Sequence, residues 1–161
     1  MENNNRLVTV GWREWVGLPE LGVVRVKAKV DTGARSSTLH AFDIEILLRP
    51  ARPVVRFKVH PLQGAAKPEI PCEAPLLEQR WIRSSNGKRD LRPVIRTEVD
   101  LGGERWSIDL TLTSRDEMGF RMLLGREAIR KRFVVDPACS FLVRDLVPKG
   151  SKHKKKQIPS R

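Results

Sequence analysis

The sequence predicts an all-β domain with one short helix, and strand-like periodicity is the main evidence. Between Val24 and Val30, apolar residues alternate with Arg or Lys, a period of two that is typical of a half-buried strand. Asn86-Gly87 and Gly102-Gly103 have the composition of tight hairpin turns. The first of these turns predicts a hairpin over Arg83–Leu91 that could close over a site as a flap. The apolar face of the first strand would consist of Val24, Val26, Ala28 and Val30.

Turn signals bound the other elements. Pro19-Glu20 separates the first two strands, and Asp136-Pro137 breaks the chain after the helix. The helix is predicted over Arg126–Phe133, directly after Gly125. Its inward-facing residues would be Ala128, Ile129 and Phe133. Strands are expected at Leu7–Leu18, Val23–Val30, Phe42–Leu48, Val54–Val59, Val94–Leu101, Trp106–Thr113, Phe133–Val135 and Phe141–Val143.

One folded domain is expected, because 161 residues match the usual size of a single unit. We expect a disordered N-terminus over 1–6, a folded domain over 7–148 and a disordered basic tail over 149–161. The tail, KGSKHKKKQIPSR, has six of the 31 basic residues and no acid, a composition that no packed core accommodates. The other 25 basic residues still exceed the 19 acidic ones, so +6 remains outside the tail.

The positive charge favours acidic partners without choosing among nucleic acid, anionic lipid and acidic polypeptide. The two cysteines, Cys72 and Cys139, lie far apart in the sequence. Free thiols in a cytoplasmic protein are therefore the expectation, with a single disulfide left open. The sequence has no signal-peptide pattern and no apolar run of about 18 residues. We therefore expect no membrane segment.

Two motifs about ninety positions apart indicate the chemistry of the chain. Asp31-Thr32-Gly33 follows the strand that ends at Val30, and Met122–Arg126, with the sequence MLLGR, precedes the predicted helix. A DTG triplet alone is common in turns. Its combination with a later apolar-apolar-Gly-Arg element is far more specific. Together the two motifs resemble the signature of the retropepsins, which are aspartic proteases.

Between about Val8 and Val143, the chain also resembles a bacterial family of retropepsin-like proteases often encoded beside glutamate ligases that modify a ribosomal protein. Some members of this family have been labelled ATP-dependent zinc proteases. The resemblance implies a retropepsin-like acid protease barrel that forms a homodimer, with the active site on the two-fold axis. The segments that carry it are Lys27–Ser37, His60-Pro61-Leu62, Arg80-Trp81 and Gly119–Arg126.

The resemblance implies that Asp31 of each subunit supplies one carboxyl group of a catalytic pair. Peptide hydrolysis by this route needs one carboxylate as the base and one carboxylic acid to polarise the scissile carbonyl. Two such groups about 3 Å apart share one proton, because both do not ionise at that distance. Structural support is expected from Thr32, Gly33, Ala34, Leu124, Gly125 and Arg126. Substrate contacts are expected from Arg35, Ser36, Trp81, Asn86 and Gly87.

The glycines of the two motifs have predicted scaffold roles. Gly33 would permit a tight turn and let its amide approach the carboxylate. Gly125, after Leu123-Leu124, would let the backbone pass close beneath the loop. Thr32 would hydrogen-bond across the two-fold axis and keep the two loops in register.

Arg35 departs from the viral retropepsins, which have at this position an acidic residue that pairs with the arginine of the helix element. An ion pair between position 35 and Arg126 is therefore excluded. Two alternatives stay open for Arg35: it binds an acidic side chain of the substrate, or it pairs with Glu127. The positive charge, together with the ligases of the family, implies acidic or poly-glutamylated protein tails as substrate. The basic tail leaves contact with the ribosome open.

Two functions from other classes remain as alternatives. One is a non-catalytic module that binds acidic tails on ribosomal proteins. The other is a zinc peptidase with ligands from His40, His60 or Cys72, although the sequence has neither an HExxH pattern nor paired CxxC spacing. The phosphate-binding pattern GxxxxGK followed by Ser or Thr is also absent. We therefore expect no metal and no cofactor.

Overall fold

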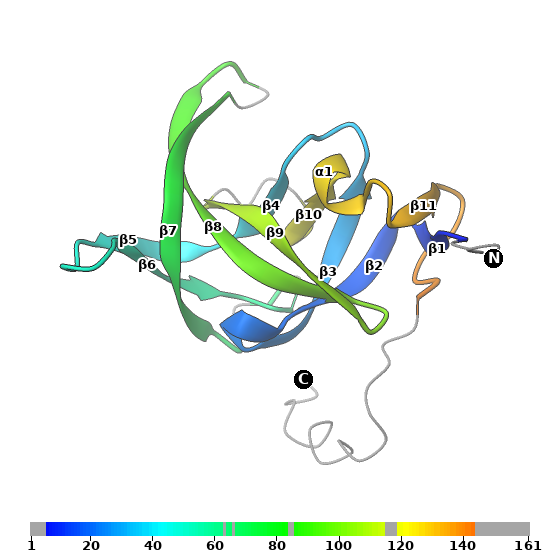
Figure 1. The fold of residues 1–161 in the computed structure, drawn as a ribbon, viewed down its shortest axis with the longest axis horizontal. Coiled ribbons are helices and arrows are strands. Elements are labelled where there is room, and N and C mark those ends of the chain that lie inside the picture. Colours follow the sequence, from blue (N-terminus) through cyan, green and yellow to red (C-terminus); the bar gives the residue numbers. More distant parts are fainter. Residues whose placement is uncertain (1–5, 63, 66, 84–85, 115–118, 144–161) are drawn as a thin grey trace, which may run out of the picture.

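Six strands close into a barrel in the computed structural model (Figure 1). The structure describes residues 6–62, 64–65, 67–83, 86–114 and 119–143. The ring closes where Gly17 pairs with Asp100. Residues 149–161, expected to form a disordered tail, lie outside the described residues. In barrel order the strands are β2 (Arg13–Leu18), β3 (Val23–Asp31), β10 (Met122–Gly125), β4 (Ser37–His40), β9 (Glu104–Thr113) and β8 (Arg89–Leu101).

Three more strands extend the sheet beyond β8. β7 (Ile70–Arg83) pairs with β6 (Val54–Val59) along its first half and with β8 along its second half, and β5 (Phe42–Leu47) is the outer strand. The ends of β7 and β8 form the predicted hairpin, which projects from the barrel in Figure 1. Gly87 in its turn has a φ of 84°, a left-handed conformation that suits a tight turn.

A separate two-stranded sheet brings the two ends of the described chain together. β1 (Val8–Gly11) runs parallel to β11 (Phe133–Asp136). The helix α1 (Arg126–Ile129) connects β10 to β11, and a 3-10 turn over Pro19–Leu21 connects β2 to β3. No helix in the described part of the chain is long enough to cross a bilayer, since α1 has four residues and about 20 are needed.

Aliphatic side chains from every strand of the ring fill the barrel. Each fully buried side chain of this kind stabilises the fold by about 1.5–3 kcal/mol relative to an exposed one. Close packing of such residues fixes the relative positions of the strands. One fully buried member from each strand, in barrel order, is Val16, Val26, Leu124, Leu39, Leu110 and Val99.

The structure confirms the all-β architecture and most of the predicted elements. Gly102 and Gly103, with φ of 64° and 86°, form the turn between β8 and β9 as expected. Ile70–Arg83 was not predicted as a strand, because Pro71 and Pro75 lie within it. These prolines fall where β7 pairs only with β6. No described strand pairs with the other edge of β7 there, so the missing N–H groups interrupt no strand ladder.

The predicted apolar face of β3 is wrong at its first residue. Val24 is 66% exposed and Val23 is buried. The register between β2 and β3 shifts between Val16 and Leu18, and this bulge places an extra residue at the start of β3 and reverses the alternation there. The remaining members of the predicted face, Val26, Ala28 and Val30, are buried as expected.

The predicted end of the helix and one predicted strand are also wrong. The helix ends at Ile129 instead of Phe133, because Lys131 adopts a left-handed φ of 66° that turns the chain into β11. Phe141–Val143 does not form a strand. Phe141 has a φ of 53°, which interrupts the extended conformation. The three expected inward-facing residues of the helical segment, Ala128, Ile129 and Phe133, are nonetheless buried.

A buried carboxylate, Glu14, fastens the C-terminal segment to the barrel. Its Oε2 accepts hydrogen bonds from Gly11 N at 2.6 Å and Leu142 N at 2.9 Å, and its Oε1 accepts one from Val143 N at 3.1 Å. Glu14 is 0% exposed, and the three N–H donors replace its hydration. Because Glu14 lies on β2, which pairs with β3, it supports the strand that leads into Asp31.

Replacing Glu14 with Gln should lower the free energy of unfolding by about 2–3 kcal/mol, because an amide offers a single acceptor oxygen to three N–H donors at a buried position. Urea unfolding followed by tryptophan fluorescence measures this change. Glu45→Gln is the control, since Glu45 is exposed on β5 and should change stability by less than about 0.5 kcal/mol. Equal free energies of unfolding for Glu14→Gln and the unmodified protein would show that Glu14 does not fasten the C-terminal segment to the barrel.

Candidate active site

The loop that follows β3 holds the carboxylate of Asp31 with its own backbone. Gly33 N and Ala34 N donate hydrogen bonds to Oδ1 of Asp31 at 3.0 and 3.2 Å. Asp31 is half-exposed. The carboxylate is thus fixed in orientation and remains open to water or a ligand. The approach of the Gly33 amide agrees with the role expected for this glycine.

β10 lies between β3 and β4 and brings the second motif beneath this loop. Gly125 is the register partner of Asp31 in the parallel pairing of β10 with β3. A Cβ atom at position 125 would lie 2.5 Å from Ser36 O and 2.9 Å from Arg35 O, which is too close for any side chain. Gly125 is therefore required by a close backbone contact, in agreement with its expected packing role.

Ser37 makes a contact that sequence analysis missed. Gly125 N donates a hydrogen bond to Ser37 Oγ at 3.0 Å, and the bond is buried. It satisfies an N–H group at the end of β10 and joins that strand to the start of β4. The two residues are 88 positions apart, so no local spacing in the sequence indicated the pair.

The first residues of α1 bind the backbone of the same loop. Arg126 N donates to Ala34 O at 2.8 Å, and Glu127 N donates to Arg35 O at 3.2 Å. The Arg126 guanidinium donates from Nη1 to Gly33 O at 3.3 Å. Arg126 thus holds the loop through two successive carbonyl oxygens, those of Gly33 and Ala34, and needs no acidic partner to do so.

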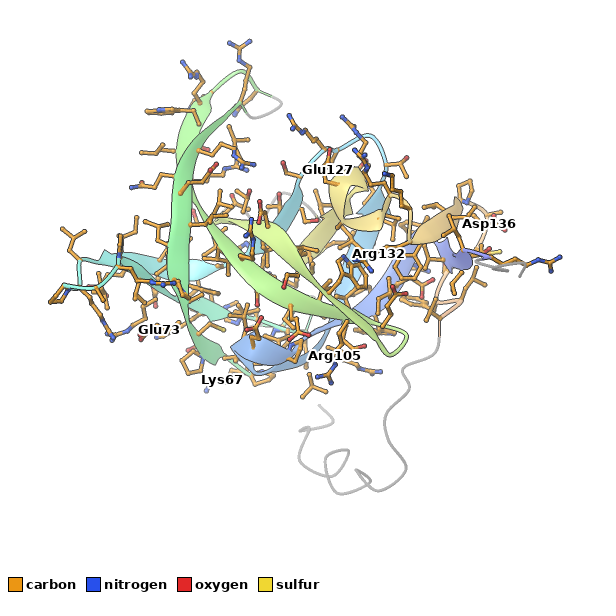
Figure 2. The ribbon with its side chains drawn as sticks, in the orientation of Figure 1. Lys67, Glu73, Arg105, Glu127, Arg132 and Asp136 are labelled. Carbon is orange, nitrogen blue, oxygen red and sulfur yellow. The ribbon has the colours of Figure 1, made fainter. Side chains whose placement is uncertain are left out.

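Of the two alternatives for Arg35, the structure contains the ion pair with Glu127. Arg35 Nε lies 3.8 Å from Glu127 Oε1, and the two side chains are 77% and 49% exposed. Figure 2 shows Glu127 on α1, beside the loop between β3 and β4. An exposed pair of this kind contributes about 0–1 kcal/mol. A ligand carboxylate could therefore replace Glu127 at little energetic cost.

The structure brings the motif residues together and places the predicted hairpin residues apart from them. Thr32 is exposed in the loop, Ser36 is half-buried, and Leu124 is fully buried below. The β7–β8 hairpin projects from the same end of the barrel as the β3–β4 loop, but its tip lies away from α1 (Figure 1). The expected substrate contacts on this hairpin are Trp81, Asn86 and Gly87.

The three residues considered as zinc ligands lie in different local environments, which are a backbone hydrogen bond, a ring stack and a buried strand position. Cys72 Sγ donates to Leu21 O at 3.4 Å. Burial raises the pKa of the Cys72 thiol to about 11, so in the metal-free protein it keeps its proton at neutral pH. His60 stacks on Phe42 with 4.1 Å between ring centroids, and His40 is buried on β4. Among the residues that the structure describes, no three His, Cys, Asp or Glu side chains gather as metal ligands.

The barrel is similar to a solved structure of unknown function. A protein from Legionella pneumophila superposes with a TM-score of 0.70 at 28% sequence identity, and the match covers 85% of this chain and 98% of that one. The fold is thus present over nearly the whole length of that Legionella protein.

Longer relatives share this segment as one part of their length. Proteins named "Probable alpha-L-glutamate ligase" from Shewanella pealeana and Parasynechococcus marenigrum are 45% and 49% identical over 139 and 141 residues, which are 86% and 88% of this chain. In both relatives the shared segment is 30% of the protein. This chain therefore spans less than a third of the length of these relatives.

The family described as "Retropepsin-like aspartic endopeptidase RimB" matches residues 9–145. This stretch contains the closed barrel, the loop that holds Asp31 and the Gly125 contact beneath it. The fold, the site geometry and the extent of the match agree. The chain belongs to the RimB-like family of retropepsin-like aspartic endopeptidases.

Proposed function

We propose that two copies of this chain form an aspartic endopeptidase whose catalytic groups are the two Asp31 carboxyls. The observation that carries the proposal is the carboxylate of Asp31, which two backbone amides fix at the open end of β3. Each chain has one such loop, so a pair of carboxyls requires a second subunit. A symmetric dimer with the loops on its axis supplies that pair.

In this mechanism the two Asp31 carboxyls hold one proton between them. The ionised group takes a proton from water, and the protonated group donates a hydrogen bond to the scissile carbonyl oxygen. The water oxygen bonds to the carbonyl carbon, a proton moves to the leaving nitrogen, and the C–N bond breaks. Gly33, Ala34 and Arg126 act as positioning residues: the amides of Gly33 and Ala34 orient the carboxyl of Asp31, and Arg126 holds the loop.

We propose acidic, glutamate-rich protein tails as the substrate class. The sequence outside residues 149–161 has a surplus of six positive charges, which attracts acidic peptides. Two longer relatives that contain this segment are named probable α-L-glutamate ligases. A ligase that adds glutamate forms the same kind of peptide bond that a hydrolase of glutamate-rich tails breaks. The presence of this segment within relatives named as glutamate ligases therefore supports this substrate class.

Replacing Asp31 with Asn should lower kcat on a glutamate-rich peptide by about 10²–10⁴-fold, because the pair loses its base. Mass spectrometry of the products gives the rate, and sedimentation should show a dimer for both forms. Asp109→Asn is the matched control, since Asp109 pairs with Arg96 at 3.0 Å on an exposed part of β9. Full activity of Asp31→Asn, or an active protein that sediments as a monomer, would rule out the proposal.

The rate of cleavage should pass through a maximum as the pH rises from mild acid to alkali. Below the optimum both Asp31 carboxyls are protonated and no base remains, and above it both are ionised and no acid remains. Measuring kcat/KM across this range on the same peptide tests the shared proton. A rate that is independent of pH would be incompatible with a carboxyl pair.

Replacing Arg126 with Lys should lower kcat by about tenfold and leave KM nearly unchanged, because Lys lacks the planar fork that reaches Gly33 O. The backbone N–H of position 126 still binds Ala34 O, so the fold should persist. Arg130→Lys is the control, since Arg130 pairs only with exposed Glu127 among the described residues. An unchanged kcat for Arg126→Lys would show that the guanidinium does not position the loop.

A further inference from the structure

The β7–β8 hairpin presents two faces of different character. Side chains project from both sides of this two-stranded arm (Figure 2). Successive residues of a strand point to opposite faces, and directly opposed residues share a face. Two such opposed pairs, Trp81 with Leu91 and Arg83 with Arg89, form one face, which we call the arginine–tryptophan face. The other face has Arg80 opposite Arg92 and Ile82 opposite Asp90.

The arginines of the second face are neutralised by acids on the same face. Arg80 Nη2 lies 2.7 Å from Glu78 Oε1, and Arg92 Nη2 lies 3.5 Å from Asp90 Oδ2. This face therefore has as many acids as arginines among these four residues. Its charges need no ligand to balance them.

On the arginine–tryptophan face, no described acidic side chain neutralises the arginines. Arg83 and Arg89 are both exposed, and within the described ranges neither forms an ion pair with an acidic side chain. The guanidinium of Arg89 instead lies 5.3 Å from the ring centroid of Trp81. Two like charges directly opposite on a sheet destabilise it. The pair is thus unfavourable for the hairpin alone and becomes favourable when an anion lies between the two guanidinium groups.

Apolar surface lies directly beside these two charges. Trp81 is 59% exposed and Leu91 is 46% exposed. Large exposed side chains that adjoin uncompensated arginines are typical of a binding surface. An extended acidic chain suits this surface, because its methylene groups can lie on Trp81 and Leu91 while its carboxylates reach Arg83 and Arg89.

The alternation along β8 relates this face to the barrel. Ile95 and Thr97 are buried, with Ile95 in the core, and Leu91 and Arg89 follow at the same period of two. The register irregularity in this region falls in β7, between Leu76 and Glu78, so the alternation of β8 continues unbroken. The arginine–tryptophan face therefore continues the inward face of the barrel wall. It belongs to the hairpin that projects from the same end as the Asp31 loop (Figure 1).

We infer that Arg83 and Arg89, with Trp81 and Leu91 between them and the barrel, bind carboxylate side chains of an extended acidic peptide and so determine specificity for such substrates. The inference rests on the proposed function for the identity of the peptide as substrate. A second copy of this face is a poor occupant, because a symmetric contact would oppose four arginines. Single-stranded nucleic acid fits less well, since this face offers one tryptophan, whereas such strands stack successive bases on several aromatic side chains.

Binding to an inactive form tests the inference without relying on cleavage. In the Asp31→Asn background, fluorescence anisotropy measures binding of a labelled oligoglutamate peptide, an oligoglutamine peptide of equal length and an oligouridylate. Adding Arg83→Gln and Arg89→Gln should weaken oligoglutamate binding about tenfold, as expected for two exposed charge pairs. Binding of oligoglutamine should not change.

The matched control removes the same charge elsewhere. Arg80→Gln with Arg105→Gln eliminates two arginines that are already paired with Glu78 and Asp100 at 2.7 and 2.8 Å, and should change oligoglutamate binding by less than about twofold. Thermal unfolding verifies that both double variants fold. Equal losses in the two double variants would overturn the inference, as would oligouridylate binding more tightly than oligoglutamate.

Failure of the inference and failure of the proposed function are separable in this experiment. Mass spectrometry of the oligoglutamate after incubation shows whether Asp31→Asn still cleaves it, which would refute only the catalytic role of Asp31. Unchanged oligoglutamate binding after Arg83→Gln and Arg89→Gln, with the peptide intact, would refute only the binding role of the hairpin.

Discussion

The backbone contact between Gly125 and the loop after β3 is the constraint on which the candidate site depends. Gly125 is the register partner of Asp31, and it meets the carbonyl groups of Arg35 and Ser36 at a distance that no side chain would allow. A contact made by backbone atoms has no rotamer that could adapt, so it fixes the height of the loop above β10. The amides that hold the carboxylate of Asp31 are therefore positioned before any substrate arrives.

Support for this loop extends to the end of the described chain. Glu14 binds the amides of Leu142 and Val143, and Arg13 O accepts a hydrogen bond from Phe141 N at 3.0 Å. These two neighbours lie on β2, which pairs with β3 along most of its length. The C-terminal segment thus stabilises the strand that leads into Asp31. A network in which every donor is satisfied rigidifies the surrounding structure, and this one is anchored on β2, the direct neighbour of the strand that ends at Asp31.

The electrostatic effect of the arginines depends on whether an acidic side chain lies beside them. Arg80, Arg96 and Arg105 each pair with an acid, so their fields largely cancel at short range. Arg83 and Arg89 lie on a projecting hairpin without acidic partners in the described ranges, and their fields add. The placement of charge, more than its total, distinguishes one surface as a site for an anionic ligand. That surface and the Asp31 loop occupy the same end of the barrel (Figure 1).

Local patterns in the amino-acid sequence were enough to predict the alternating strands, the Gly102-Gly103 turn, the two motifs and the family to which they point. The sequence left open whether Arg35 pairs with Glu127, and it gave no sign that Glu14 is buried or that Ser37 binds Gly125. These contacts join segments up to 129 positions apart, and a glutamate or serine has the same letter whether it lies in water or in a core. They became visible in the folded chain, because burial and hydrogen-bond partners arise from packing between strands that are distant in sequence.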